Sequence, residues 1–310
     1  MIESDDFEEK ISAIIVVGIG SAGICALESM IEEPICGVGF IAVDTDAEAL
    51  KNSSAPKKIQ LAVKATKGSA TGEICQPSLK EVEDSVNGAD LVILVADMGG
   101  ENGTGRIKVI ANAARNLGTG MIVAIITRPF SHEDKKHIET AEAEILALSS
   151  MVDSLIVIPM DILASGSSPA TDLAEKIKAG NAILTDVVRG ITELITSYGL
   201  MDFDYSDVKT VLPSKCPVTF GVGKASGKDR ALEAFKKALH PLSRRGVDID
   251  QATGILVNIT GSDDMNMDEY NVINNYIHSK VHKDVIIKIG VVRDDDLAAN
   301  LKVSVYLSKR

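Results

Sequence analysis

The sequence lacks the features of a membrane-spanning, secreted or zinc-binding protein. Its 310 residues are 45% hydrophobic, yet no apolar run approaches 18 residues, so we expect a soluble chain that spans no membrane. The acidic start, residues 1–10, contains no apolar core of a signal peptide, which argues against secretion. The four cysteines form no CxxC pair, so we expect reduced thiols in a cytoplasmic protein and no zinc site.

Basic residues are also scarce relative to acidic ones. The chain has 32 Lys and Arg against 44 Asp and Glu, which gives a net charge of -12. This balance argues against general nucleic-acid binding. It also predicts that any self-assembly needs salt or divalent cations to screen the repulsion between like charges. The length suits two domains.

The most informative stretch that is present is glycine-rich. Residues 97–105, Asp-Met-Gly-Gly-Glu-Asn-Gly-Thr-Gly, follow the apolar run 91–96, which is typical of a buried parallel strand. Apolar residues then recur at helical spacing over 107–117. A strand, a glycine-rich turn and a helix N-terminus form an anion cradle, because backbone N–H groups converge there and the helix dipole favours negative charge. Four glycines within seven residues exceed the needs of a ligand-free turn, so the stretch predicts phosphate binding.

A second glycine pattern, Gly18-x-Gly20-x-x-Gly23, follows an apolar, β-branched run near the start of the chain. An acid, Asp44, ends the next expected strand about twenty residues later, which completes the dinucleotide-binding fingerprint. Alone, this pattern suits an NAD or FAD enzyme as well as a GTPase. The glycine-bearing loops 67–72 and 99–105 favour the GTPase, because a Rossmann oxidoreductase has no need of the latter.

Strands and helices alternate along the first half of the chain, which predicts a parallel, doubly wound α/β sheet. The expected strands and helices after the glycine-rich stretch are 121–126, 133–148 and 155–158. A long helix with a wide apolar face is expected over 173–196. The pattern then becomes that of a smaller α+β domain, with strands at 218–222, 254–259, 285–292 and 301–307 and helices at 230–239 and 267–278.

The segment Met98-Gly-Gly-x-x-Gly-Thr-Gly105 resembles the tubulin signature loop as found in FtsZ, the bacterial and archaeal division GTPase. Further segments follow in the family's order: Phe40–Asp46, Thr127–Phe130, Leu155–Pro159, Asp204–Thr210 and Gly254–Gly261. The resemblance extends from Ile14 to about Leu307 and implies a tubulin/FtsZ-like fold. It implies a GTP-binding, Rossmann-like domain over 1–172, a central helix over 173–197, a catalytic-loop connection over 198–213 and a C-terminal α+β domain over 214–310.

The resemblance also implies a site shared between two subunits. One subunit holds GTP or GDP with Mg²⁺, and the next inserts a loop of the form Asn-x-Asp-x-x-Asp whose carboxylates orient the attacking water. Here that loop gives catalytic roles to Asp202, Asp204 and Asp207, the first replacing the Asn. A merely solvated loop is the alternative. The implied nucleotide contacts are Gly18, Gly20, Ser21, Ala22, Gly23, Cys25, Asp44, Gly68, Gly72, Gly99, Gly100, Glu101, Asn102, Gly103, Thr104, Gly105, Glu133, His137 and Asn181.

Several of these positions depart from the family pattern. Glu101 and Asn102 replace a Gly and a Thr, and a carboxylate about 4 Å from a phosphate charge costs ~1 kcal/mol in water and ~4 at an effective dielectric near 20. The other departures are Asp44 for an Asn, His137 for an Arg, Met160 for an Asn and Ile177 for the aromatic that stacks on guanine. We therefore predict a degenerate nucleotide site with weak or lost GTP hydrolysis. An active, polymerisation-coupled GTPase of cell division is the alternative, and an NAD-binding oxidoreductase is a distant one.

The resemblance further implies a cytoskeletal protein that assembles with itself. Head-to-tail contacts leave open ends and so produce filaments, which could associate into bundles. The chain stops within three residues of its last expected strand. We therefore expect no linker and C-terminal peptide of the kind with which FtsZ proteins bind membrane-tethering partners, and no direct membrane contact.

Overall fold

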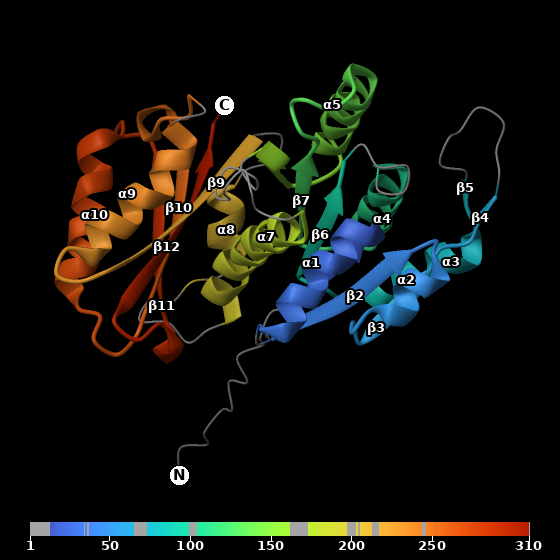
Figure 1. Ribbon diagram of the computed structural model, residues 1–310, viewed down its shortest axis with the longest axis horizontal. Coiled ribbons are helices and arrows are strands. Elements are labelled where there is room, and N and C mark those ends of the chain that lie inside the picture. The colour runs from blue at the N-terminus through green and yellow to red at the C-terminus, as the bar shows by residue number, and fades with distance from the viewer. Residues whose placement is uncertain are drawn as a thin grey trace, which may run out of the picture.

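The computed structural model describes residues 13–33, 35, 37–64, 73–98, 104–161, 173–196, 203, 205–212, 217–243 and 246–309. Figure 1 shows an elongated molecule in which an N-terminal half, coloured blue to green, and a C-terminal half, coloured orange to red, flank the helices α7 and α8. Within the described residues, ten strands form one sheet in the order β11-β10-β12-β9-β8-β7-β6-β1-β2-β3.

The strands of the N-terminal half are parallel, which confirms the predicted doubly wound sheet. They are β1 (Ile14–Ile19), β2 (Val38–Asp44), β3 (Lys57–Gln60), β6 (Leu91–Asp97), β7 (Met121–Arg128) and β8 (Ser154–Pro159). The helices between them are α1 (Gly20–Glu32), α2 (Ala47–Asn52), α3 (Gln76–Val86), α4 (Thr104–Asn116) and α5 (Lys135–Ser149).

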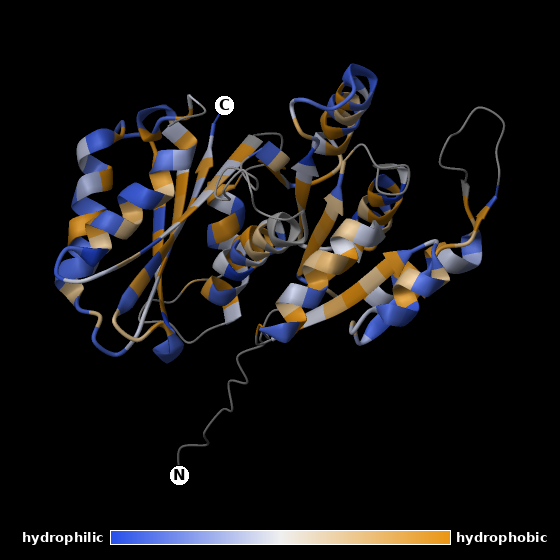
Figure 2. Cartoon of the chain, in the orientation of Figure 1, coloured by the Kyte–Doolittle hydropathy of each residue, from blue (hydrophilic) through white to orange (hydrophobic). Residues whose placement is uncertain are grey.

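The apolar strand residues explain this arrangement. Successive side chains of a strand point to opposite faces, so β1 places Val16 in a core with residues of α1 and Val17 in a second core with residues of α3 and α4. Both faces of the sheet are therefore covered. Figure 2 shows the hydrophobic strands between helices whose outward sides are hydrophilic.

The C-terminal half has a mixed sheet. Its strands are β9 (Pro217–Ser226), β10 (Gly254–Gly261), β11 (Ile286–Arg293) and β12 (Asn300–Ser308), with β12 antiparallel to both of its neighbours and β10 parallel to β11. The helices α9 (Arg230–Ser243) and α10 (Met267–Lys280) pack together, and short 3-10 helices span Ile249–Gln251 and Asp295–Leu297. The two halves join where β8 pairs with β9 at two positions. The predicted domain boundaries remain a prediction.

The helix α7 (Leu173–Thr196) has the predicted bounds and lies between the two halves (Figure 1). The fully buried Tyr306 of β12 donates its hydroxyl hydrogen to the Val187 carbonyl oxygen of α7 at 2.6 Å. A Cβ atom on Gly190 would lie 2.4 Å from that hydroxyl, so only glycine fits beneath the tyrosine. This contact fixes the long helix against the C-terminal sheet.

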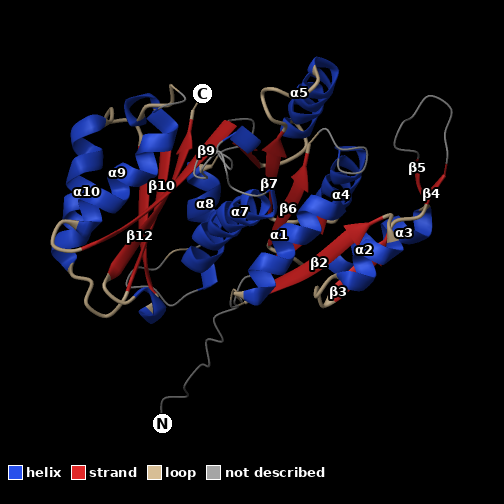
Figure 3. Cartoon of the chain, viewed as in Figure 1, coloured by secondary structure: helices blue, strands red, loops and turns tan. Residues whose placement is uncertain are grey.

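Several short elements differ from the sequence-based expectation (Figure 3). The pattern did not predict α2, β3 or the pair β4 (Val63–Lys64) and β5 (Glu73–Ile74). It also treated Asp207 as part of a loop, whereas Asp207 lies in the first turn of α8 (Tyr205–Val211). These elements have two to seven residues, too few for a hydrophobic period to be recognised.

Candidate functional site

The carboxyl ends of the parallel strands define the candidate site. The strand order reverses at β1, whose neighbours are β2 on one side and β6 on the other, and ligands bind α/β sheets at such a switch point. In the register, Ile19 lies beside Val43 and Ala96. The residues that follow these three, Gly20, Asp44 and Asp97, therefore lie in a row along the edge of the sheet.

The three glycines of the fingerprint have separable structural roles. Gly20 begins α1 with a φ of +73°, a backbone conformation that favours glycine. A Cβ atom on Gly18 would lie 2.6 Å from the Gly23 carbonyl oxygen, and one on Gly23 would lie 2.5 Å from the Val95 carbonyl oxygen. The glycines thus let α1 approach β1 and β6 closely.

The start of α1 faces the edge of the sheet without a side-chain cap, because its N-cap residue is Ile19. Its first backbone N–H groups are therefore free to bind an anion. Ser21 and Ala22 lie in this first turn, and Cys25 follows as an exposed free thiol. All three were predicted as nucleotide contacts, and that role remains a prediction.

Asp44 is buried, with 2% of its surface exposed, and its charge is offset by Arg106 of α4. The Asp44 Oδ1 atom accepts hydrogen bonds from the Thr45 N–H at 2.6 Å, the Asp46 N–H at 3.3 Å and the Arg106 guanidinium at 3.1 Å. The same guanidinium donates to the Thr45 hydroxyl at 2.8 Å. Burial lowers the pKa of Arg106, and Asp44 opposes that effect. Asp44 therefore does not add the uncompensated charge that the sequence suggested.

Arg106 was not among the predicted site residues, although it directly follows Gly105 in the glycine-rich stretch. Thr104 and Gly105 open α4, and Arg106 lies in the same first turn. The ion pair thus joins the end of β2 to the start of α4, the helix that follows the predicted phosphate-binding loop. The available signal was a cation directly after the glycine-rich loop, since its pairing with Asp44 is visible only in the fold.

Asp97, at the end of β6, was also not among the predicted site residues. Burial raises the pKa of the Asp97 carboxyl, and nearby Asp44 adds to the rise whereas His137 opposes it. A Cβ atom on Gly20 would lie 3.9 Å from the Asp97 Oδ1 atom, so this carboxyl group borders the start of α1. The edge therefore carries a second acid beside Asp44.

Glu133 and His137 form a pair at the start of α5. The Glu133 Oε2 atom lies 2.7 Å from the His137 Nδ1 atom, and its Oε1 atom accepts a hydrogen bond from the Phe130 N–H at 2.9 Å. The His137 Nε2 atom is buried and has no hydrogen-bond partner. The structure thus brings together two residues that were predicted as separate nucleotide contacts.

Asn181 of α7 reaches the same region. Its Nδ2 atom donates to the Cys25 carbonyl oxygen at 3.4 Å, which places the predicted base contact beside α1. Met160, where the family pattern has an Asn, is partly buried and packs against the core that contains α1 and α7.

Some predicted residues lie outside the described part of the chain. They are Gly68, Gly72, Gly99, Gly100, Glu101, Asn102, Gly103, Asp202 and Asp204, together with the side chains of Thr104 and Ile177. Their assigned roles remain predictions.

The described catalytic candidate, Asp207, lies far from this edge within its own chain. The next turn of α8 is anchored by Lys209, whose Nζ atom donates to the Gly120 carbonyl oxygen at 2.8 Å. Gly120 immediately precedes β7, so α8 lies at the amino end of a strand whose carboxyl end is at the candidate site. Eight residues of strand span about 25 Å. Asp207 itself forms an ion pair with Lys288 of β11.

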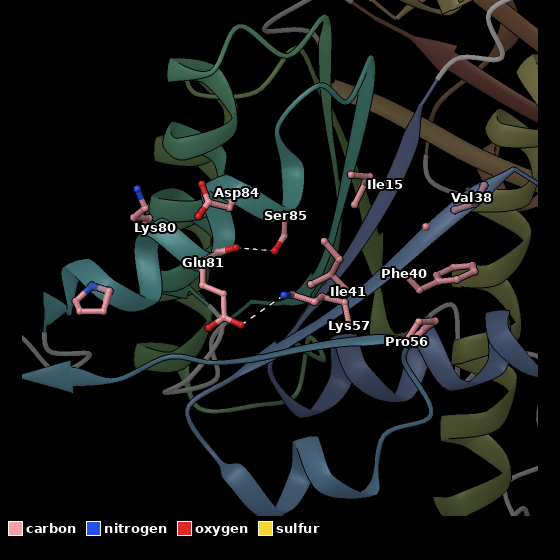
Figure 4. Close-up of a pocket in the computed structure, with 12 residues that line it drawn as sticks. Ile15, Val38, Phe40, Ile41, Pro56, Lys57, Lys80, Glu81, Asp84 and Ser85 are labelled. Carbon is pink, nitrogen blue, oxygen red and sulfur yellow. Dashed lines mark hydrogen bonds and ion pairs between the residues drawn. The ribbon is translucent and has the colours of Figure 1, made fainter.

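A separate hollow lies at the opposite end of the strands. A space of about 740 Å³ separates α3 from the first residues of β1 and β2, and Figure 4 shows Lys80, Glu81 and Asp84 of α3 on one side of it. The Lys57 Nζ atom and the Glu81 Oε1 atom are 3.6 Å apart across it. Because it opens near the amino ends of the strands, it is not part of the candidate site.

Within the described residues, no three His, Cys, Asp or Glu side chains are grouped so that they could hold a metal ion. The helices of that part of the chain are also too short or too polar to cross a bilayer.

Comparison with known proteins identifies the class. The model of the tubulin/FtsZ family GTPase domain matches residues 13–167, and that of the FtsZ family C-terminal domain matches residues 218–308. The cell division protein FtsZ of Buchnera aphidicola subsp. Acyrthosiphon pisum (strain APS) is 39% identical over 297 residues, which cover 94% of this chain and 77% of that protein. The FtsZ of Wigglesworthia glossinidia brevipalpis is 38% identical over 301 residues, covering 95% and 78%.

Solved structures agree. An FtsZ dimer of M. jannaschii superposes with a TM-score of 0.84 at 28% identity, covering 97% of this chain and 89% of that one. CetZ2 from Haloferax volcanii, solved as a protofilament, has a TM-score of 0.74 at 17% identity over 96% and 93%, which shows the shared fold alone. The fold is that of the tubulin/FtsZ class. Within that class, the chain belongs to the FtsZ family, as its motifs indicated, and the oxidoreductase alternative is not favoured.

Proposed function

We propose that this chain is a cytoplasmic, FtsZ-like cytoskeletal protein that forms head-to-tail filaments. It binds GTP or GDP with Mg²⁺ at the carboxyl edge of its parallel sheet. The nucleotide site is degenerate, and hydrolysis is weak or lost. Its main partner is other copies of the same chain, and it makes no direct contact with membrane or nucleic acid.

The observation that carries the proposal is the separation of Asp207 from the row formed by Gly20, Asp44 and Asp97. Lys209 ties α8 to the amino end of β7, whereas the row lies at carboxyl ends. A carboxylate in α8 can therefore assist chemistry at this edge only if it belongs to another subunit. Stacking subunits in one direction satisfies that need at every contact and leaves both ends open, as a filament requires.

Weak hydrolysis follows from the charges at the edge. Catalysis of phosphoryl transfer depends on positioning the γ-phosphate and neutralising its charge. In the described part of the edge, Arg106 is already paired with Asp44, and Asp97 lies beside them. Glu101 adds a further acid in the predicted phosphate loop. Binding can be supported by Mg²⁺, but a γ-phosphate in this field is held less firmly.

Assembly is tested by sedimentation and electron microscopy of purified protein at micromolar concentration, with Mg²⁺ and crowding agent. We expect single or bundled protofilaments that persist without GTP. A chain that stays monomeric in all conditions, with and without GTP, would contradict the proposal.

Nucleotide binding is tested by chromatography of the nucleotide that remains bound through purification. The substitution Asp207→Asn is the matched control, since it leaves the edge of its own chain unchanged and should retain the same nucleotide content. The double substitution Glu101→Gly and Asn102→Thr should strengthen binding. The competing function, an active polymerisation-coupled GTPase of cell division, is favoured instead if the unaltered protein shows rapid, concentration-dependent turnover that Asp207→Asn abolishes.

A further inference from the structure

The outer face of α10 carries little charge, although the chain as a whole is strongly acidic. Its exposed positions recur at helical spacing and are occupied by Asp268, Asn271, Val272, Asn275 and Ser279. The one charged residue of this set, Asp268, lies in the first turn, where the helix dipole favours an acid. Val272 is 43% exposed. The middle of this outer face therefore presents side chains without a formal charge.

Other surface helices expose charged side chains instead. The exposed residues of α3, α5 and α9 include Lys80, Glu81, Asp84, Lys135, Lys136, Glu139, Glu233, Lys236 and Lys237. Because each copy of the chain has a net charge of -12, two copies repel one another as they approach. An uncharged face lets them meet without burying unpaired charges, which is why charged residues are depleted in the centres of protein interfaces.

The helix α10 is held firmly from its inner side. Ile273 and Ile277 are fully buried, and the Asn266 side chain caps the helix by accepting a hydrogen bond from the Glu269 N–H at 3.2 Å. The Glu269 carboxylate in turn accepts a hydrogen bond from the Arg230 Nε–H of α9 at 2.6 Å. Figure 1 shows α10 beside α9 on the outer side of the C-terminal half. The outer face is therefore presented on a fixed helix, so that a contact there orders little additional structure.

The two asparagines indicate which partner this face fits. A side-chain amide both donates and accepts hydrogen bonds, so the amide of Asn275 can pair with the same amide of a second copy. A lysine or a glutamate cannot pair with its own duplicate, because the two charges are alike. Contact between a surface and the same surface of a second copy is the arrangement that two-fold symmetry produces. The outer face of α10 is thus complementary to itself.

We propose that the outer face of α10 is a lateral contact, at which α10 of one filament packs against α10 of a second filament. The inference rests on the proposed head-to-tail filament and adds the surface that joins filaments into bundles. The contact repeats at every subunit along both filaments, so each single contact can be weak and the bundle still be stable.

The test compares two sedimentation speeds in Mg²⁺, which screens the net charge. Low speed collects bundles, and high speed collects all filaments. The variants are Asn275→Glu and Asn275→Lys. The matched control is Leu146→Glu on α5, which adds the same negative charge at a side chain that is 74% exposed. Electron microscopy identifies bundles and single filaments, and circular dichroism confirms that each variant is folded.

We expect Asn275→Glu and Asn275→Lys each to lose the low-speed pellet and to keep the high-speed pellet, whereas Leu146→Glu keeps both. Mixing preformed filaments of the two Asn275 variants should restore bundles, because glutamate then meets lysine.

Bundles that persist in Asn275→Glu, or that Leu146→Glu loses equally, would overturn this inference and leave the filament proposal standing. The same holds if the mixture stays unbundled or if the unaltered protein forms single filaments alone. Loss of the high-speed pellet in a folded Asn275 variant would also overturn it, because α10 would then belong to the head-to-tail contact. If the unaltered protein gives neither pellet, the proposed function fails as well.

Discussion

The buried ion pair between Asp44 and Arg106 predicts that removing one of its charges destabilises the protein more than removing both. Arg106→Met keeps the apolar stem of the side chain and removes its charge. Asp44 would then be a carboxyl group with 2% exposure whose hydrogen bonds, within the described residues, come from the N–H groups of Thr45 and Asp46. Removing one partner of a buried pair costs about 3–5 kcal/mol, because the other charge stays desolvated and unpaired. We expect a loss of that size in the free energy of unfolding.

The double substitution Asp44→Asn with Arg106→Met should recover most of this loss, since replacing both charges of a buried pair is often close to neutral. The matched control is Arg115→Met on the same helix. Arg115 pairs with Asp153 at 3.0 Å, but its side chain is 42% exposed, and Asp153 also accepts a hydrogen bond from the Ile122 N–H at 2.8 Å, so its loss should cost less than that of Arg106.

Urea unfolding followed by circular dichroism measures the unaltered protein, these three variants and Asp44→Asn alone. The last completes a double-mutant cycle that gives the coupling between the two side chains. A cost of Arg106→Met no larger than that of Arg115→Met would contradict the expected penalty for an unpaired buried charge. The absence of any recovery when Asp44→Asn is added to Arg106→Met would contradict it as well.

Three further outcomes are expected from contacts elsewhere in the chain. Gly190→Ala should lower the melting temperature strongly, because its Cβ atom would lie 2.4 Å from the Tyr306 hydroxyl, and adding Tyr306→Phe should restore part of the loss in thermal unfolding. Lys288→Met should remove the ion pair between Asp207 and Lys288 and raise the Mg²⁺ concentration needed for filaments to sediment, whereas Lys288→Arg should behave like the unaltered protein. Burial raises the pKa of Glu193, so ionising it costs stability above that pKa and the cost disappears on acidification. Glu193→Gln should therefore stabilise the protein at pH 8, with an advantage that shrinks by pH 5, as the difference between melting temperatures at the two pH values will show.

Much of the fold could be predicted because its strongest signals are local. The run 91–96 is a buried strand in the structure, and the long helix has the predicted bounds 173–196. The glycines at 18 and 23 allow close contact between backbone segments, and Gly20 has a positive φ. Their spacing is visible in the sequence. Short elements such as α2 escaped prediction, since six residues are held by an Asp46 cap and by neighbours more than by a hydrophobic period.

The candidate site was less predictable because its chemistry depends on pairs that are distant in sequence. Asp44 and Arg106 are 62 residues apart, and the pairing that cancels their charges requires the fold. Glu133 and His137 are four residues apart, which helical spacing could have joined. Asp97 looked like part of a strand, and only its burial beside Asp44 and the start of α1 shows that it borders the site.

These pairs change the charge expected at the nucleotide site but leave its expected location unchanged. The sequence counted Asp44 as an added charge against phosphate, yet Arg106 offsets it. Asp97 takes its place as the acid without a fixed cation in the described part of the edge. A charge of this kind can be removed by a proton or balanced by Mg²⁺, so it weakens binding under some conditions and permits it under others. In the function proposed above, hydrolysis has a further requirement, since the Asp207 carboxylate of a second subunit would have to meet a firmly held γ-phosphate. Binding and assembly can therefore persist where turnover does not, and each of the three should respond differently to pH, Mg²⁺ and the substitutions proposed above.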